Sequence, residues 1–154
     1  MNRRPSKAPD RAQPAATAEL RHRIARELEN HGLKGTPQRM LVAQLLLKAP
    51  RHLTAEQILK ELKGTGHRVS KATVYNTLNM LSEHGLIREI HLGGDQTVYD
   101  STSTPHHHFH NVDTGELVDI RPEQIDLQRL PPLPEGTETA GVEVVIDEGV
   151  GPVI

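Results

Sequence analysis

Apolar residues recur with helical spacing along the first half of the chain and then alternate with polar ones further on. Leu20, Ile24 and Leu28 stand four positions apart, which predicts a helix that ends at Gly32. Each of three further predicted helices follows a residue whose side chain can cap it: Thr36 before residues 37–49, Thr54 before 55–64, and Ser70 before 71–84.

Two β-hairpins are predicted where the alternation begins. In the first, residues 86–92 and 97–100 flank the turn sequence GGDQ. Helices followed directly by a hairpin are the order of a winged helix-turn-helix. In that arrangement residues 71–84 would be the recognition helix, which enters the major groove of DNA, and the hairpin would be the wing.

The second hairpin pairs residues 106–112 with 116–120, and we expect a short helix within 121–130 and a strand over 142–146. Three short strands bury too little surface to be stable alone, so pairing with a second copy is expected. We therefore predict an α+β protein with an N-terminal winged helix-turn-helix and a small C-terminal α/β dimerisation domain. The predicted parts are a disordered basic arm (1–17), a DNA-binding domain (18–100) and a dimerisation and metal-sensing domain (101–154).

Charge is distributed unevenly between the two halves. Residues 1–100 carry 16 Lys and Arg against 10 Asp and Glu, whereas residues 101–154 carry 2 against 10. This polarity favours a first half that faces a polyanion, although solvated surfaces alone would also produce it.

Composition excludes several kinds of chemistry. The chain has no cysteine, so disulfides, cysteine-bound zinc and thiol catalysis are excluded. No apolar run is long enough to cross a membrane, and the N-terminus lacks the apolar stretch of a secretion signal. A cytoplasmic protein with no membrane partner is the expectation.

The predicted recognition helix has a polar face suited to DNA. Lys71, Tyr75 and Asn79 share one side, with Thr73 and Asn76 beside them. An ammonium can bind phosphate, a carboxamide can pair with an adenine edge, and a ring can contact thymine methyl groups. Any exposed helix can be polar, so the position of this helix before a hairpin carries the argument. Lys34 and Arg39 are candidate phosphate or minor-groove contacts.

Histidines gather in the sequence PHHHFH. In an extended strand His106 and His108 point to the same side and His107 away from it. Asp119 follows on the next predicted strand, and Asp100 ends the wing. Imidazoles with carboxylates suit Zn²⁺, Fe²⁺ or Mn²⁺. Solvated histidines without a metal are the alternative.

A metal-dependent hydrolase is a competing hypothesis, because two histidines and an aspartate also describe a hydrolytic centre. The chain has no His-Glu-x-x-His motif, no glycine-rich phosphate loop and no evident general base. A structural dimer with an incidental metal is a third hypothesis, and it would show no sequence-selective DNA binding.

The chain resembles the ferric uptake regulator family. The resemblance lies in GLKGTPQR (32–39), RHLTAEQI (51–58), VSKATVYNTLNML (69–81), VYD (98–100), HHHFHN (106–111) and GELVDI (115–120). It implies a repressor that binds a pseudo-palindromic double-stranded DNA operator as a homodimer. The implied metal ligands are His52, Asp100, His106, His108 and Asp119. The implied DNA contacts are Lys34, Arg39, Tyr75 and Asn76.

Departures from the family pattern suggest a branch. Asn111 and Thr114 stand where many relatives have a Cys-x-x-Cys pair, so the structural zinc site is absent. Asn76 stands where many relatives have arginine, which would alter the target sequence. Asp119 is typical of peroxide-sensing members, whereas the triple histidine resembles the iron response regulator branch.

The iron response regulator branch implies control of iron and haem genes, with haem as a ligand at the triplet His106, His107 and His108. Peroxide sensing with iron or manganese is the alternative function.

Overall fold

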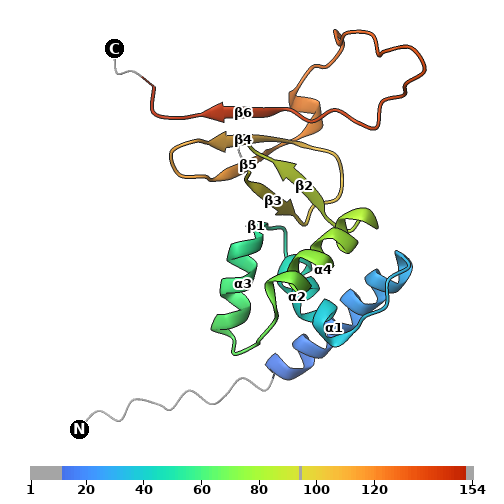
Figure 1. Cartoon of the computed structure of the whole chain (residues 1–154), viewed down its shortest axis with the longest axis vertical. Helices are drawn as coiled ribbons and strands as arrows, with labels where there is room; N and C mark the ends of the chain where they lie inside the picture. The colour runs from blue at the N-terminus through green and yellow to red at the C-terminus, as the bar shows by residue number, and fades with distance from the viewer. Residues whose placement is uncertain (1–11, 94, 152–154) are drawn as a thin grey trace. The chain divides into compact units, whose positions relative to one another are not determined.

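The structure, a computed structural model, describes residues 12–93 and 95–151. The chain divides into two compact units, one ending at Ser103 and one starting at Thr104. The first unit contains α1 (Ala12–Asn30), α2 (Pro37–Leu47), β1 (His52–Thr54), α3 (Ala55–Gly64), α4 (Lys71–Glu83), β2 (Arg88–His91) and β3 (Thr97–Asp100) (Figure 1).

The three predicted caps begin the three helices that follow them. Thr36 and Ser70 accept hydrogen bonds from the backbone N–H groups of Arg39 and Thr73. Thr54 forms a reciprocal capping box with Gln57. These local bonds satisfy donors that the first turn of a helix leaves open, which explains why the sequence alone predicted these starts.

Helix α1 starts earlier than expected. Residues 1–17 were predicted to be a disordered arm, but α1 begins at Ala12. The segment 12–19 is rich in alanine, the residue with the highest helix propensity, and Pro14 lies in the first turn, where proline is tolerated. The rest of the predicted arm, residues 1–11, lies outside the described residues.

Gly85 shows how α4 ends. Its φ is 77°, in the left-handed region that favours glycine. The next N–H, from Leu86, donates to Leu81 O at 2.9 Å and closes the last turn. This sharp reversal leads directly into β2.

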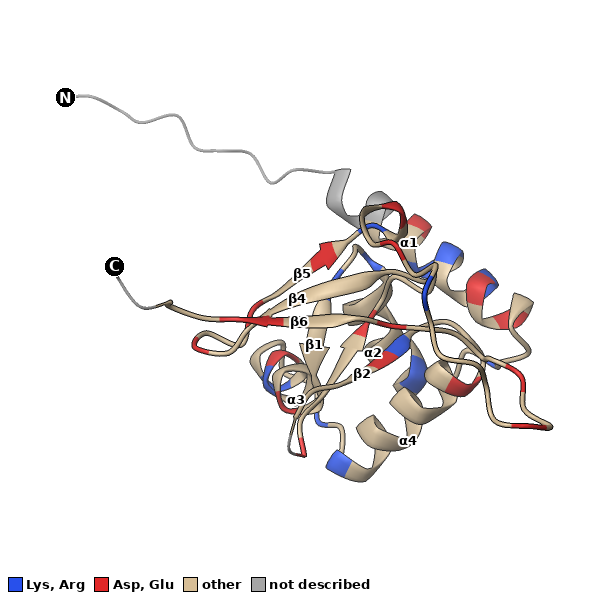
Figure 2. Ribbon diagram, turned by 90° about the horizontal axis from the view of Figure 1, so that it is seen from above, with Lys and Arg blue, Asp and Glu red and all other residues tan. Residues whose placement is uncertain are grey.

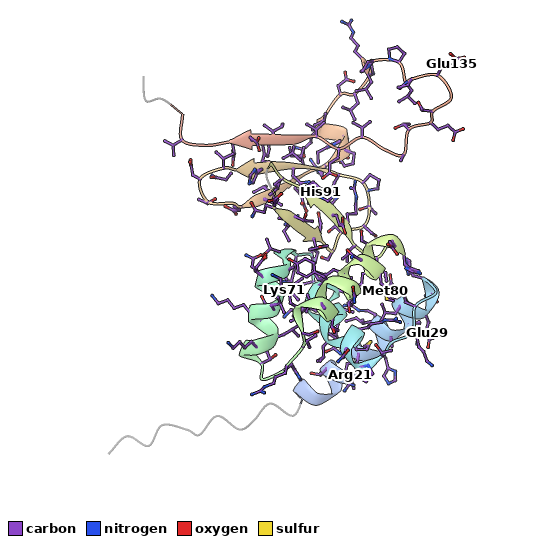
Figure 3. The ribbon with its side chains drawn as sticks, in the orientation of Figure 1. Arg21, Glu29, Lys71, Met80, His91 and Glu135 are labelled. Carbon is purple, nitrogen blue, oxygen red and sulfur yellow. The ribbon has the colours of Figure 1, made fainter. Side chains whose placement is uncertain are left out.

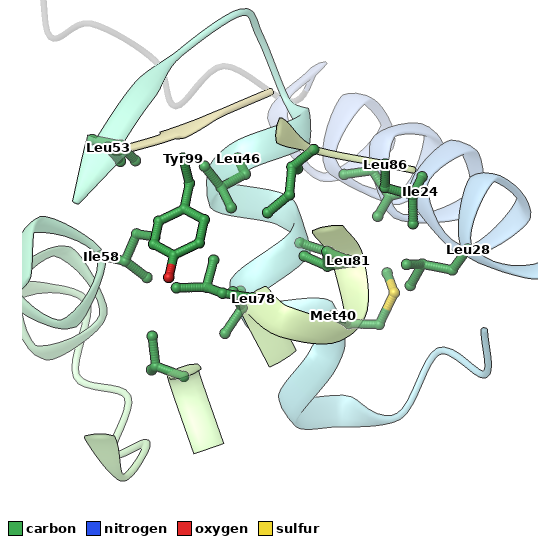
Figure 4. Close-up of a cluster of buried hydrophobic side chains, with 14 of the residues drawn as sticks. Ile24, Leu28, Met40, Leu46, Leu53, Ile58, Leu78, Leu81, Leu86 and Tyr99 are labelled. Carbon is green, nitrogen blue, oxygen red and sulfur yellow. The ribbon is translucent and has the colours of Figure 1, made fainter. Parts of the chain in front are cut away.

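One apolar core holds the helices of the first unit together. Leu28, Leu46, Ile58, Leu78 and Leu81 are fully buried, each from a helix (Figure 4). Leucine, isoleucine and valine fill most of it, since aromatic residues make up only 2% of the chain. The phenol of Tyr99 is buried in the same cluster, and burial raises its pKa above 10.0, with the nearby Glu89 carboxylate adding to the effect.

A three-stranded antiparallel sheet in the order β1-β3-β2 completes this unit. The wing hairpin β2–β3 was predicted. Strand β1 was not, because three residues carry no readable alternation and their partner strand lies over forty positions away. The pairing places His52 directly opposite Asp100.

The second unit is a three-stranded sheet in the order β5-β4-β6. Its elements are β4 (His107–Asn111), β5 (Leu117–Ile120), the 3₁₀ turn η1 (Pro122–Gln124) and β6 (Val145–Glu148). β5 pairs antiparallel with β4, as the predicted hairpin requires, and β6 pairs with β4 in parallel. No helix in the described ranges is both long and apolar enough to span a bilayer.

Two predicted elements of this unit differ from the structure. The helix expected within 121–130 is reduced to η1, and no side chain of η1 is buried to anchor a longer one. The strand expected over 142–146 starts later, at Val145. The Val144 N–H donates to the ring of His107 instead of a backbone carbonyl, so regular strand pairing begins one residue further on.

Candidate metal centre and nucleic-acid interface

The second unit brings three candidate metal ligands together. His108 on β4 lies opposite Asp119 on β5, and His106 immediately precedes β4. The Nε2 atoms of both histidines lie 3.4 Å from Oδ1 of Asp119. The ligand atoms of these three residues lie within 4.8 Å of one another. Two imidazoles and one carboxylate therefore converge on one point.

The protonation of His106 follows from its neighbour. Nδ1 of the buried His106 ring lies 2.7 Å from the carbonyl oxygen of Thr104. A carbonyl only accepts hydrogen bonds, so Nδ1 must carry the proton. The lone pair of the neutral ring is then on Nε2, the atom that faces Asp119. His106 is held in the tautomer that a metal ligand requires.

His108 lies between two carboxylates. Its side chain is 1% exposed, its Nε2 faces Asp119, and its Nδ1 lies 3.2 Å from Oε1 of Glu143. Glu143 was not among the predicted site residues. The signal in the sequence was a single carboxylate within the otherwise apolar segment VEVVI.

The first unit brings together the other two candidate ligands. Nε2 of His52 lies 3.2 Å from Oδ2 of Asp100, whose side chain is 1% exposed. The second carboxylate oxygen, Oδ1, accepts a hydrogen bond of 2.8 Å from Thr102 N. The backbone thus orients Asp100 and leaves Oδ2 directed at His52.

The donor types fit a divalent transition metal. Imidazole nitrogen combined with carboxylate oxygen suits Zn²⁺, Fe²⁺ or Mn²⁺, whereas Ca²⁺ prefers oxygen alone. The tautomer of His106 directs its lone pair at the other donors, which agrees with ligation. The residues present therefore fit a bound metal of this kind.

His107 has a different environment from its two neighbours. It is buried, and its Nδ1 accepts a hydrogen bond of 2.9 Å from Val144 N. A backbone N–H must donate, so Nδ1 supplies the lone pair and the proton of the neutral ring is on Nε2. Binding an iron at Nε2 of His107 would require the other tautomer and the loss of this hydrogen bond, which connects residue 144 to β4.

An ion pair that the sequence did not predict supports the first pair of ligands. Arg51, next to His52, binds both carboxylate oxygens of Glu61 on α3, at 2.5 and 3.0 Å. Its guanidinium also donates to Leu45 O in α2, and its backbone N–H donates to Ser101 Oγ. Arg51 thus connects the strand that carries His52 with two helices and with the residue after Asp100.

This ion pair predicts an acid-sensitive contribution to stability. The hydrogen bond from Arg51 lowers the pKa of Glu61 below its ordinary value of 4.5. A carboxyl with a lowered pKa stabilises the fold above its unfolded-state pKa, and this contribution disappears as the pH falls through the folded-state value. Because the Glu61 side chain is 36% exposed, solvent screening limits the contribution to about 0.5–1 kcal/mol at neutral pH.

We therefore expect Glu61→Gln to be less stable than the wild type at pH 7, and the difference to shrink below about pH 4.5. Urea unfolding followed by circular dichroism at a series of pH values measures this. Glu135→Gln, at an exposed position labelled in Figure 3, is the control. A difference that does not change with pH would contradict the assignment.

Helix α4 presents a polar surface. Lys71, Asn76 and Asn79 are exposed and Thr73 and Tyr75 partly so, whereas Val74, Leu78 and Leu81 face the core. The Lys71 ammonium lies 5.9 Å from the centre of the Tyr75 ring. Figure 3 labels Lys71 and Met80 along this helix, and Figure 2 shows basic residues on α1, α2 and α4.

The candidate DNA contacts fall into two groups. Arg39, Thr73 and Asn76 line one recess of about 260 Å³, together with Gln38 and other residues of α2 and α4. The Arg39 side chain also donates to Lys34 O, which keeps these two basic residues adjacent. Tyr75 lines a separate, smaller cavity with Tyr99. Gln38 is not among the predicted contacts, because its position at the start of α2 gives no sign that α4 lies beside it.

These features define a class of protein: a winged-helix DNA-binding regulator that carries a candidate site for a divalent metal. The ferric uptake regulator family matches residues 30–145, three quarters of the chain, and the chain belongs to this family. Its members are transcription regulators and not enzymes.

The similar proteins include regulators named for peroxide and regulators named for ferric uptake. The peroxide operon regulator of Bacillus subtilis is 34% identical over 93 residues, which is 60% of this chain and 64% of that protein. The ferric uptake regulation protein of Vibrio anguillarum is 34% identical over 102 residues, covering 64% of this chain and 68% of that protein. The match thus spans less than two thirds of the Bacillus protein.

A solved structure extends the comparison. The ferric uptake regulator of Pseudomonas aeruginosa, determined with manganese, is 28% identical and has a TM-score of 0.65. The similarity covers 84% of this chain and 98% of that one.

Proposed function

We propose that the protein is a homodimeric repressor that binds a pseudo-palindromic DNA operator when one divalent metal ion is bound by His52, Asp100, His106, His108 and Asp119. The observation that carries the proposal is the convergence of His106, His108 and Asp119, with His106 held in the ligating tautomer. We place this role in the cytoplasm. The relatives named as a peroxide operon regulator and as a ferric uptake regulation protein support control of genes of peroxide defence or of iron uptake.

In this proposal the two units have distinct tasks. The first binds DNA through α4 and the start of α2, using Lys34, Arg39, Lys71, Thr73, Tyr75, Asn76 and Asn79. The second dimerises and senses the metal. A single ion shared by ligands from both units would fix the orientation of α4 relative to the dimer.

That orientation would decide affinity for DNA. In a two-fold dimer the recognition helices must enter major grooves about 34 Å apart or a multiple of that distance. A ligand shifts such an equilibrium only as far as it prefers one state, so the metal must bind the DNA-competent arrangement more tightly.

We favour Mn²⁺ or Fe²⁺ as the ion and peroxide as the signal. Asp119 and the relative named a peroxide operon regulator support this choice. Iron bound at such a site supplies the chemistry by which peroxide oxidises a ligating histidine. The occupied lone pair of His107 argues against haem binding across the triplet.

The test is selection of binding sites from a random double-stranded DNA library by the full chain, with and without Mn²⁺. A two-fold symmetric consensus, enriched only with Mn²⁺, is the expected result. No enriched sequence under either condition would refute the proposed function.

A second arm separates the signals. The selected DNA is titrated in a gel-shift assay with the iron form before and after peroxide, and with haemin. Release by peroxide, with a mass increase on a peptide containing a ligating histidine, supports peroxide sensing. Release by haemin, with a new absorption band that His106→Ala removes, would favour the haem alternative.

A further inference from the structure

Glu143 contacts a candidate metal ligand from the side that faces away from the other donors. Its Oε1 lies 3.2 Å from Nδ1 of His108, which is ion-pair distance, although the two atoms are not aligned as a hydrogen bond. The two side chains are 23% and 1% exposed. Nε2 of the same ring faces Asp119. The two nitrogens of an imidazole point in divergent directions, so a carboxylate at Nδ1 is poorly placed to bind an ion held at Nε2.

The backbone around Glu143 is fixed to the histidine strand. Val144 N donates to Nδ1 of His107 at 2.9 Å, and His108 N donates to Val144 O at 3.1 Å. The parallel pairing of β6 with β4 continues from this point. These bonds hold the carboxylate of the preceding residue, Glu143, against the His108 ring.

A carboxylate at the outer nitrogen of a ligating histidine has known physical effects. It keeps the proton on that nitrogen, fixes the orientation of the ring and makes the inner nitrogen a stronger donor. His106 has a different arrangement, because its outer nitrogen donates to the neutral carbonyl of Thr104. The two histidines are thus oriented by partners of different charge.

We propose that Glu143 is a positioning residue: it holds the proton on Nδ1 of His108, directs Nε2 toward the metal and strengthens that bond without ligating the ion. The inference rests on the proposed metal role of His108. It makes the C-terminal strand part of the metal site, since the residue that tunes His108 is anchored through β6.

The test compares Glu143→Ala and Glu143→Gln with Asp147→Asn in the full chain. Asp147 is a matched control, because it forms a 2.9 Å contact with Nδ1 of His110 on the same pair of strands, and His110 is not a proposed ligand. Mn²⁺ affinity is measured by competition with a chelating dye. The tautomer of His108 is read by long-range ¹H–¹⁵N NMR of the metal-free protein, which needs no metal binding.

We expect Glu143→Ala to weaken Mn²⁺ binding by about 10- to 100-fold and to remove the Nδ1–H signature of His108. Glutamine keeps an accepting oxygen but not the charge, so Glu143→Gln should retain the tautomer and lose part of the affinity. Asp147→Asn should change neither. Thermal unfolding of the metal-free variants checks that each is folded. If the Glu143→Ala protein is unfolded, Glu143→Gln still tests the inference, because glutamine is nearly the same size as glutamate.

Two results would overturn the inference. One is wild-type Mn²⁺ affinity and tautomer in both Glu143 variants. The other is loss of Mn²⁺ binding in Glu143→Ala with the His108 tautomer unchanged, which would make Glu143 a direct ligand. If the wild type itself binds no Mn²⁺, the proposed function fails, while the NMR result still decides whether Glu143 sets the tautomer.

Discussion

His108→Ala is expected to weaken Mn²⁺ binding by about 100-fold or more, since a ligand should contribute at least as much as the outer-shell partners of ligands do. Its ring is almost completely buried and its Nε2 lies 3.4 Å from Asp119. Alanine removes one of the nitrogen donors of the proposed ligand set. Dye-competition titration of the full chain measures the loss, and circular dichroism checks the fold.

The same substitution should make DNA binding independent of the metal. With wild-type protein, Mn²⁺ should strengthen binding to the selected operator, and with His108→Ala the curves with and without Mn²⁺ should coincide. His110→Ala is the control, because His110 lies on the same strand but contacts Asp147 instead of Asp119. A His108→Ala protein that binds Mn²⁺ like the wild type would remove His108 from the proposed ligand set.

Local signals explain why the helices could be predicted from the sequence. Thr36, Thr54 and Ser70 each bond to a backbone N–H within three residues, so the information lies within one turn of the helix. The same holds for the hairpins, whose turns fix the pairing of adjacent strands. The start of α1 at Ala12 could not be predicted in this way, because the prolines and basic residues of this segment indicate an arm whereas its alanines favour a helix.

The candidate site could be predicted only in part, because its residues meet through long-range pairing. His106, His108 and Asp119 belong to one hairpin, and strand alternation was enough to group them. His52 and Asp100 are 48 positions apart and meet through the pairing of β1 with β3, so only the family resemblance indicated His52. Glu143 meets His108 through a parallel strand after a long loop, and neither spacing nor alternation could show that contact.

Under the proposed function, Arg51 connects a metal ligand with the helices of the winged helix. The residue binds Glu61 on α3 and Leu45 O in α2 through its side chain, and His52 is its neighbour in the chain. If metal binding displaces His52, these short polar contacts are where α2 and α3 would be affected. Under the proposed function, this connection would allow a metal ion bound at His52 to change the orientation of α2 and α3.

Phe109→Glu is expected to convert the protein from a dimer to a monomer. Phe109 on β4 lies directly opposite Val118 on β5 and Ile146 on β6, so the three share one face of the sheet. They are 38%, 47% and 40% exposed, and together they form an apolar patch that a second copy can cover by two-fold symmetry. A buried, unpaired carboxylate at its centre would oppose association strongly.

Loss of the dimer should weaken operator binding by about 100-fold or more, because the second half-site is then no longer bound at high effective concentration. Sedimentation velocity reports the oligomeric state, and gel-shift titration of the selected operator reports affinity. Val150→Glu is the control, because Val150 is 90% exposed and lies beyond β6. Phe109 projects from the face opposite His108, so Mn²⁺ binding should survive in the monomer. A Phe109→Glu protein that still sediments as a dimer would place the interface on another surface.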